Sequence, residues 1–91
     1  MLASFVVTDR SGDDSCTRLF DFCTRVTCTI ANTGMASGTA DVTMNVYRRG
    51  KSPLAATEQV EIPRGQQRVV SHDFHGTRLF DSNVKYSCEV R

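Results

Sequence analysis

The 91-residue sequence has no strong excess of either charge, since eleven lysines and arginines stand against ten aspartates and glutamates. Proteins that bind nucleic acid use a concentrated basic surface to neutralise phosphates, and this near balance predicts no nucleic-acid partner. Long apolar runs are missing as well: the run Phe5 to Val7 is far shorter than the roughly 18 to 20 residues that cross a bilayer. We therefore expect no membrane-spanning segment.

Helical periodicity is also missing, because apolar residues at helical spacing are never sustained over the length of a helix. Period-two alternation, typical of strands with one buried face, takes its place. It is clearest in three segments: Arg25 to Ala31, Asp41 to Tyr47 and Val84 to Arg91. It is weaker in three more: Ala3 to Thr8, Ala55 to Ile62 and Gln67 to Phe74. We expect a single all-β domain over residues 1–91, built as an antiparallel sandwich of about six or seven strands.

Turn residues separate these segments and support the same fold. They stand at four places: Asn32-Thr33-Gly34, Arg49-Gly50-Lys51, Pro63-Arg64-Gly65 and His75-Gly76. Glycine supplies a positive φ at such positions, and proline presets its own φ. One stretch, Ser11 to Thr24, shows no strand pattern and is expected to form a looped excursion clamped on itself.

Four cysteines are present, at positions 16, 23, 28 and 88. An even number in a short chain with a small core favours disulfides and hence an oxidising compartment. We therefore expect an extracytoplasmic location: secreted, periplasmic or at the cell surface. Four cysteines admit three pairings, and their spacing does not choose among them.

The strand pattern places Cys28 and Cys88 on inward positions of two well-defined strands, with Tyr86 two residues before Cys88. This arrangement resembles the immunoglobulin fold, in which strands B and F carry a disulfide between the sheets and a tyrosine precedes the second cysteine by two residues. The resemblance implies an Ig-like sandwich with a Cys28–Cys88 bond, which leaves Cys16 and Cys23 to close the excursion. Two features depart from it: the chain has no tryptophan to pack on the disulfide, and no strand G follows Cys88.

The middle of the chain resembles the CARDB-like domains of bacterial and archaeal surface proteins. The similarity covers roughly residues 25 to 75 and follows four pieces in order: Ile30 to Gly34, Val42 to Tyr47, Ile62 to Gly65 and Val69 to Phe74. It implies a module for adhesion, scaffolding or domain spacing. The missing last strand would come from Ser11 to Thr24, from Ala3 to Thr8, or from a partner chain by strand addition.

Catalysis is not expected. Ser71, His72 and Asp73 supply the residue types of a hydrolase triad, but three consecutive strand residues cannot converge on one substrate atom. A zinc site is an alternative for four residues: Cys16, Cys23, His72 and His75. Residues three apart on a strand face opposite sides, so the two histidines would need a bend between them. We therefore predict no enzyme activity, no bound metal and no cofactor.

Two groups of residues are candidates for contact with a protein partner. Leu19 and Phe20 lie in the looped excursion, and Arg48, Arg49 and Lys51 crowd a predicted hairpin tip, where Arg64 and Arg68 could join them in a basic patch. The leading hypothesis is a non-catalytic, extracytoplasmic Ig-like module that binds protein, with adjacent domains in a longer parent chain. The alternative is a small secreted inhibitor or effector that docks through residues 11–24 or through a free sheet edge.

Overall fold

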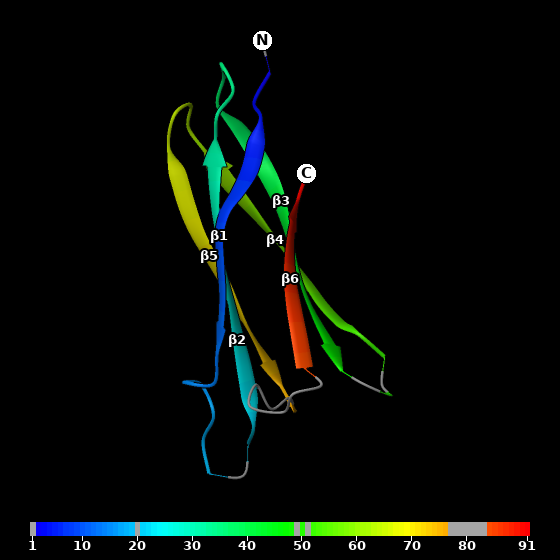
Figure 1. Cartoon of the computed structure of the whole chain (residues 1–91). Helices are drawn as coiled ribbons and strands as arrows, with labels where there is room; N and C mark the ends of the chain where they lie inside the picture. Colours follow the sequence, from blue (N-terminus) through cyan, green and yellow to red (C-terminus); the bar gives the residue numbers. More distant parts are fainter. Residues whose placement is uncertain (1, 20, 49, 51, 77–83) are drawn as a thin grey trace.

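The computed structural model describes residues 2–19, 21–48, 50, 52–76 and 84–91. These residues form six strands: β1 (Phe5–Asp13), β2 (Cys23–Asn32), β3 (Gly38–Arg48), β4 (Leu54–Ile62), β5 (Gln67–His75) and β6 (Val84–Val90) (Figure 1). Within these ranges no helix occurs, so none is long and apolar enough to span a membrane. The prediction of an all-β chain is confirmed.

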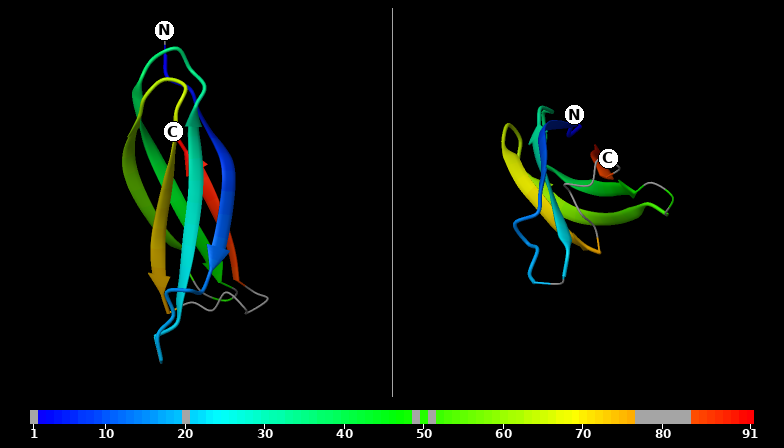
Figure 2. Two further views of the ribbon diagram at one scale, coloured as in Figure 1. Left: turned by 90° about the vertical axis from the view of Figure 1, so that its left-hand side faces the viewer. Right: turned by 60° about the horizontal axis from the view of Figure 1, so that its bottom comes forward.

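The strands form two antiparallel sheets of three strands each. One has the order β1-β2-β5 and the other the order β4-β3-β6, and they lie as two layers (Figure 2). The molecule is long and narrow, with principal extents of 47, 24 and 17 Å. Because the strands run along its length, the described loops between them lie at its two ends (Figure 1).

The core lies between the two layers and follows from the period-two pattern. On β2 the residues Val26, Cys28 and Ile30 are fully buried, and the matching positions of β3 are filled by an equally buried apolar row: Val42, Met44 and Val46. Successive strand residues point to opposite faces, so each strand gives alternate side chains to the core. Burying each of the valine, isoleucine and methionine side chains contributes roughly 1.5–3 kcal/mol to stability.

Two disulfides link the chain, in the pairing that the immunoglobulin resemblance implied. Cys28–Cys88 joins β2 to β6 and so ties one sheet to the other across the core. Cys16–Cys23 joins residues only seven apart, at the start of β2. In the chain-entropy model the long closure contributes about 4 kcal/mol and the short one about 2 kcal/mol.

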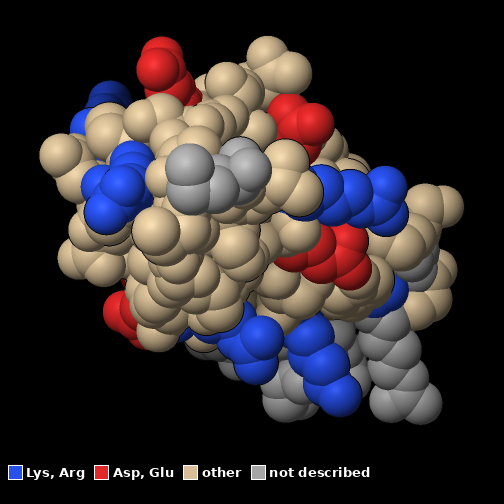
Figure 3. Space-filling model, turned by 90° about the horizontal axis from the view of Figure 1, so that it is seen from above, with Lys and Arg blue, Asp and Glu red and all other residues tan. Residues whose placement is uncertain are grey.

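One end of the sandwich is held by the buried side chain of Asn32. Its Nδ2 donates to the carbonyl oxygens of Ala36 at 2.8 Å and Ile62 at 3.0 Å. Its Oδ1 accepts from the N–H groups of Gly34 at 3.0 Å and Ser4 at 3.3 Å. The side chain therefore joins three segments of backbone, which explains why the Asn-x-Gly turn stands here. Figure 3 shows this end, where basic and acidic side chains are interspersed among uncharged ones.

The predicted limits of the looped excursion are wrong. β1 continues to Asp13 and β2 starts at Cys23, which leaves residues 14–22 as the loop rather than Ser11 to Thr24. The register shift between Val7 and Asp9 is a bulge, after which Arg10 and Gly12 pair with the inward residues of β2. Neither is apolar, so the alternation that marks a strand disappears. Gly12 is needed there, because a Cβ at this position would lie 2.8 Å from the ring of Tyr86.

Candidate functional site

The loop of residues 14–22, which we call the clamped loop, projects from the end opposite Asn32 (Figure 1). The Cys16–Cys23 disulfide closes its base, with a Cα–Cα distance of 5.5 Å. The Thr17 hydroxyl donates to the carbonyl oxygen of Cys23 and accepts from the Cys23 N–H, both at 3.0 Å. The base is therefore tied by one covalent bond and two hydrogen bonds.

The side chain of Asp13 directs the chain from β1 into the clamped loop. Its Oδ1 accepts from the Ser15 N–H at 3.0 Å and from the Ser15 hydroxyl at 2.5 Å. These bonds favour the ionised carboxylate and lower the pKa of Asp13. The Thr17 N–H donates to the carbonyl oxygen of Asp14 at 2.9 Å, so residues 14–17 form a hydrogen-bonded turn.

The tip of the clamped loop is a tight reversal of the backbone. The Arg18 N–H donates to the Asp21 carbonyl oxygen at 3.0 Å, and the Asp21 N–H donates to the Arg18 carbonyl oxygen at 2.6 Å. Leu19 lies inside this reversal with a φ of 41° and is 93% exposed. The left-handed region costs a non-glycine residue about 1–2 kcal/mol, and such strain clusters at functional sites. An apolar side chain is thus held in solvent on a strained backbone.

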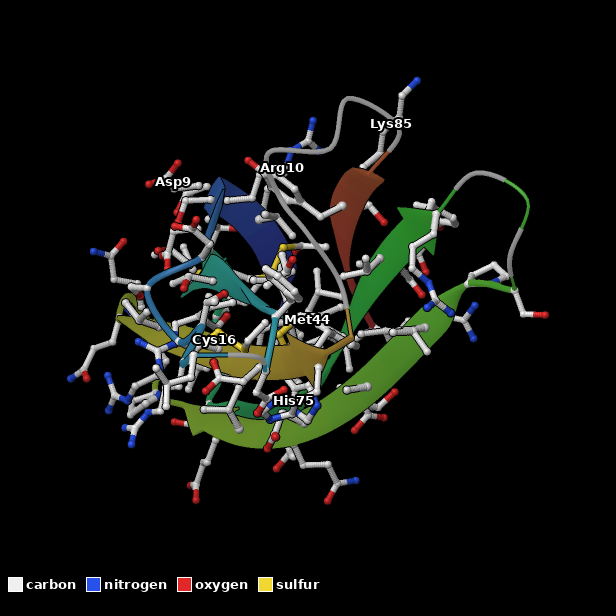
Figure 4. The ribbon with its side chains drawn as sticks, turned by 90° about the horizontal axis from the view of Figure 1, so that it is seen from below. Asp9, Arg10, Cys16, Met44, His75 and Lys85 are labelled. Carbon is white, nitrogen blue, oxygen red and sulfur yellow. A yellow bond between two sulfur atoms is a disulfide. The ribbon has the colours of Figure 1, made fainter. Side chains whose placement is uncertain are left out.

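Charged side chains support the base of the loop. Arg25 of β2 donates to Asp73 of β5 through Nε at 2.7 Å and through Nη2 at 3.2 Å. The guanidinium lowers the pKa of the Asp73 carboxyl, first through these hydrogen bonds and then through its charge. Nδ1 of His75 lies 3.2 Å from Oδ2 of Asp21, which connects β5 to the tip. Figure 4, viewed from this end, shows Cys16 and His75 there and Met44 between the layers.

The structure does not bring the four residues of the zinc alternative into one ligand set. Cys16 and Cys23 share a disulfide, so neither offers a thiolate, although Asp73 lies within 4.8 Å of their sulfur atoms. His72 faces Glu58 of β4 at 3.9 Å, while His75 faces Asp21. The two histidines differ because strand alternation directs them to opposite faces.

The basic residues of the predicted hairpin contact are only partly described. Arg49 and Lys51 lie outside the described residues, as does Phe20 of the clamped loop. Arg48 is half-buried, and its Nη2 donates to the Ser52 carbonyl oxygen at 3.0 Å. Its guanidinium therefore supports the hairpin. Arg64 and Arg68 do not form a patch with Arg48. Arg48 lies at the hairpin between β3 and β4, whereas Arg64 lies in the turn between β4 and β5 and Arg68 at the start of β5, and the whole of β4 separates the two ends.

A second feature, which the sequence pattern did not reveal, is a hollow of about 330 Å³ on the side of the sandwich between β1 and β6. It is lined by Val7, Thr8, Asp9, Arg10 and Cys88. The bulge in β1 lies at the same residues, and bulges carry no fixed sequence mark. The Thr17–Cys23 and His75–Asp21 contacts are not visible in the sequence pattern for a similar reason, since the fold brings these residues together.

Comparisons with protein-family models, curated proteins and solved structures find no match to this chain.

Proposed function

We propose that this chain is a non-catalytic protein-binding module of an extracytoplasmic compartment, and that the clamped loop inserts Leu19 into an apolar pocket of its partner. The observation that carries this proposal is the 93% exposed side chain of Leu19 at a φ of 41°. The backbone strain and the exposed apolar surface occur at the same residue, on a loop whose base is closed by a disulfide.

The restraints on the loop favour binding energetically. A flexible loop loses conformational freedom when it docks, whereas a loop held by Cys16–Cys23 and by the Arg18–Asp21 backbone pair has already lost most of it. Burying one leucine side chain then contributes about 1.5–3 kcal/mol to the complex. A passive spacer between domains needs neither a restrained loop nor an exposed leucine at its tip. The geometry therefore favours a docking role.

The charges around the tip define the partner further. The clamped loop holds two aspartates, Asp14 and Asp21, against one arginine, Arg18, which leaves a net charge of −1, and Asp13 at its base adds a further negative charge. Complementary charge at the rim of an interface steers association and selects the partner. We therefore expect the apolar pocket of the partner to have a basic rim.

Strand order and the interior disulfide support an Ig-like assignment. In immunoglobulin domains strands A, B and E share one sheet, strands C and F share the other, and a disulfide joins B to F. Here β1, β2 and β5 share one sheet, β3 and β6 share the other, and Cys28–Cys88 joins β2 to β6. β4 pairs with β3, in the place of strand C′. The CARDB-like branch is proposed on the turn residues, among which Asn32 has a clear structural role.

The remaining parts of the proposal have separate support. Disulfides persist in oxidising compartments, which favours a secreted, periplasmic or surface location. A non-catalytic role is favoured because Ser71, His72 and Asp73 follow one another on β5 and alternate between its two faces. A module in a longer chain and a stand-alone inhibitor both use the same loop, and they differ in whether docking blocks the partner's activity.

Site-specific photocrosslinking tests the proposal. A diazirine amino acid is placed at Leu19, or at Val69, which is 66% exposed on β5 and serves as the matched control. Each protein is irradiated with the extracellular and envelope fractions of the cells that make it. We expect one discrete adduct from position 19, lost when an excess of unlabelled protein competes, and none from position 69. Identical adducts from both positions, or none from position 19, would contradict the proposal.

A further inference from the structure

The side of the sandwich between β1 and β6 carries a second inference, independent of the clamped loop. β6 is hydrogen-bonded to β3 along one edge, and β1 to β2, and within the described residues neither strand has a hydrogen-bonded neighbour on its other edge. β1 and β6 contact each other through side chains, with Gly12 of β1 against the ring of Tyr86. The two strands belong to different sheets and border the same side of the molecule (Figure 2). The hollow lined by Val7 to Arg10 and Cys88 lies between them.

The hydrogen-bond register shows which backbone groups of β6 face outward. Asp41 and Arg91 exchange two N–H to carbonyl bonds, both at 3.0 Å. In an antiparallel ladder such pairs alternate with pairs that exchange no bonds, so the N–H and C=O groups of Tyr86, Cys88 and Val90 point away from β3. The side chains of the same three residues are half-buried and face the core. Within the described residues, this edge therefore offers backbone groups without hydrogen-bond partners beside an apolar row.

The other edges of the sandwich carry features that discourage strand addition. Inward-pointing charges and bulges are such features in natural sheets. On the opposite side, Glu58 of β4 and Arg68 of β5 occupy inward positions, and Glu58 pairs with His72 at 3.9 Å. β1 carries the bulge and has Arg10 at an inward position. In the described part of β6 the inward positions are uncharged and its register with β3 is regular.

The charged residues that line the hollow between β1 and β6 indicate what kind of strand fits there. Asp9 and Arg10 both line the hollow, and Oδ1 of Asp9 accepts from the Arg10 N–H at 2.9 Å. The Arg10 side chain is exposed and has no ion-pair partner within the described ranges, and Figure 4 places it toward the same side as Lys85 of β6. We propose that an extended segment of a partner protein adds to the free edge of β6. Its alternate apolar side chains contact Tyr86, Cys88 and Val90, and one of its carboxylates pairs with Arg10.

Amide exchange with synthetic peptides tests this proposal on the oxidised protein. The probe is a short peptide of alternating threonine and valine with one glutamate on the valine face. The first control has lysine in place of glutamate, and the second is N-methylated at alternate residues so that it cannot donate to β6. Exchange is followed by NMR at Tyr86, Cys88 and Val90, whose amides face the free edge in the uncomplexed protein.

We expect the glutamate peptide to slow exchange at these three amides by about tenfold near saturation, while the N-methylated peptide leaves them unchanged. The lysine peptide should bind about fivefold more weakly, and Arg10→Glu should reverse that preference. Arg68→Glu, on the opposite side, should leave it unaltered. Protection on β4 or β5, no protection at the three amides, or protection that rises with protein concentration alone would overturn the proposal. None of these outcomes bears on the clamped loop.

Discussion

At one end of the sandwich the buried side chain of Asn32 joins three segments of backbone, whereas at the other end a disulfide holds a loop that projects into solvent. Asn32 is 1% exposed and uses its amide in four hydrogen bonds. The clamped loop is tied by a disulfide and by hydrogen bonds, yet its tip presents Leu19 to water in a strained conformation. The difference shows that order at a sheet end does not require strain. The strain at Leu19 therefore points to a role other than stability.

The largest effect is expected at the Asn32 end. Asn32→Ala removes four hydrogen bonds and leaves one buried and three partly buried backbone groups without these partners, which should lower the free energy of unfolding by about 3 kcal/mol. Denaturant unfolding measures it. Asn45→Ala is the matched control, because Asn45 makes a single 3.3 Å bond to Ser87 and should cost about 1 kcal/mol or less. Equal losses in the two variants would show that Asn32 does not hold its end together.

Removing the Cys16–Cys23 disulfide should lower both the stability of the fold and the affinity for the partner. The double variant Cys16→Ser and Cys23→Ser opens a closure of seven residues and should lower the free energy of unfolding by about 2 kcal/mol. Affinity for the protein captured at position 19 should fall by about tenfold, because the freed loop must be ordered on binding. Isothermal titration of oxidised and variant protein measures the change. Unaltered affinity would show that the clamp does not prepare the loop.

Replacing the strained residue should move stability and binding in opposite directions. Asparagine tolerates a positive φ better than leucine, so Leu19→Asn should raise the free energy of unfolding by about 1 kcal/mol. The same change removes the apolar contact and should weaken binding by about tenfold or more. Leu2→Asn, at an 83% exposed leucine of the other end, should change neither quantity. A loss of stability in Leu19→Asn would mean that the tip is not strained.

The smallest effect concerns pH and the Arg25–Asp73 pair at the base of the loop. Arg25 lowers the pKa of Asp73 in the folded protein, so the stabilisation is present above the unfolded pKa near 3.8 and is lost as the pH falls through the lower folded value. The pair is partly exposed, and Asp73→Asn should lower the melting temperature by about 2 °C or less at pH 7. The difference from the wild type should vanish toward pH 2. Asp41→Asn, outside this pair, is the control.

The alternation along β2, β3 and β6 was enough to predict the strands that form the core, because each buries one face. β1 was predicted too short, since its inward positions after the bulge hold Arg10 and Gly12. Leu19 was named as a contact residue from its place in the excursion. Its positive φ could not be predicted, because it opposes the local preference of leucine and is held by the disulfide and the Arg18–Asp21 pair.

The central claim, that the clamped loop is ordered before any partner arrives, is tested most directly by the ¹⁵N order parameter of the Leu19 amide. We predict a value of about 0.8 or higher in the oxidised protein and below about 0.6 in the Cys16→Ser and Cys23→Ser variant. A value below about 0.6 in the oxidised protein would contradict the account, because Leu19 would then have to be ordered by the partner.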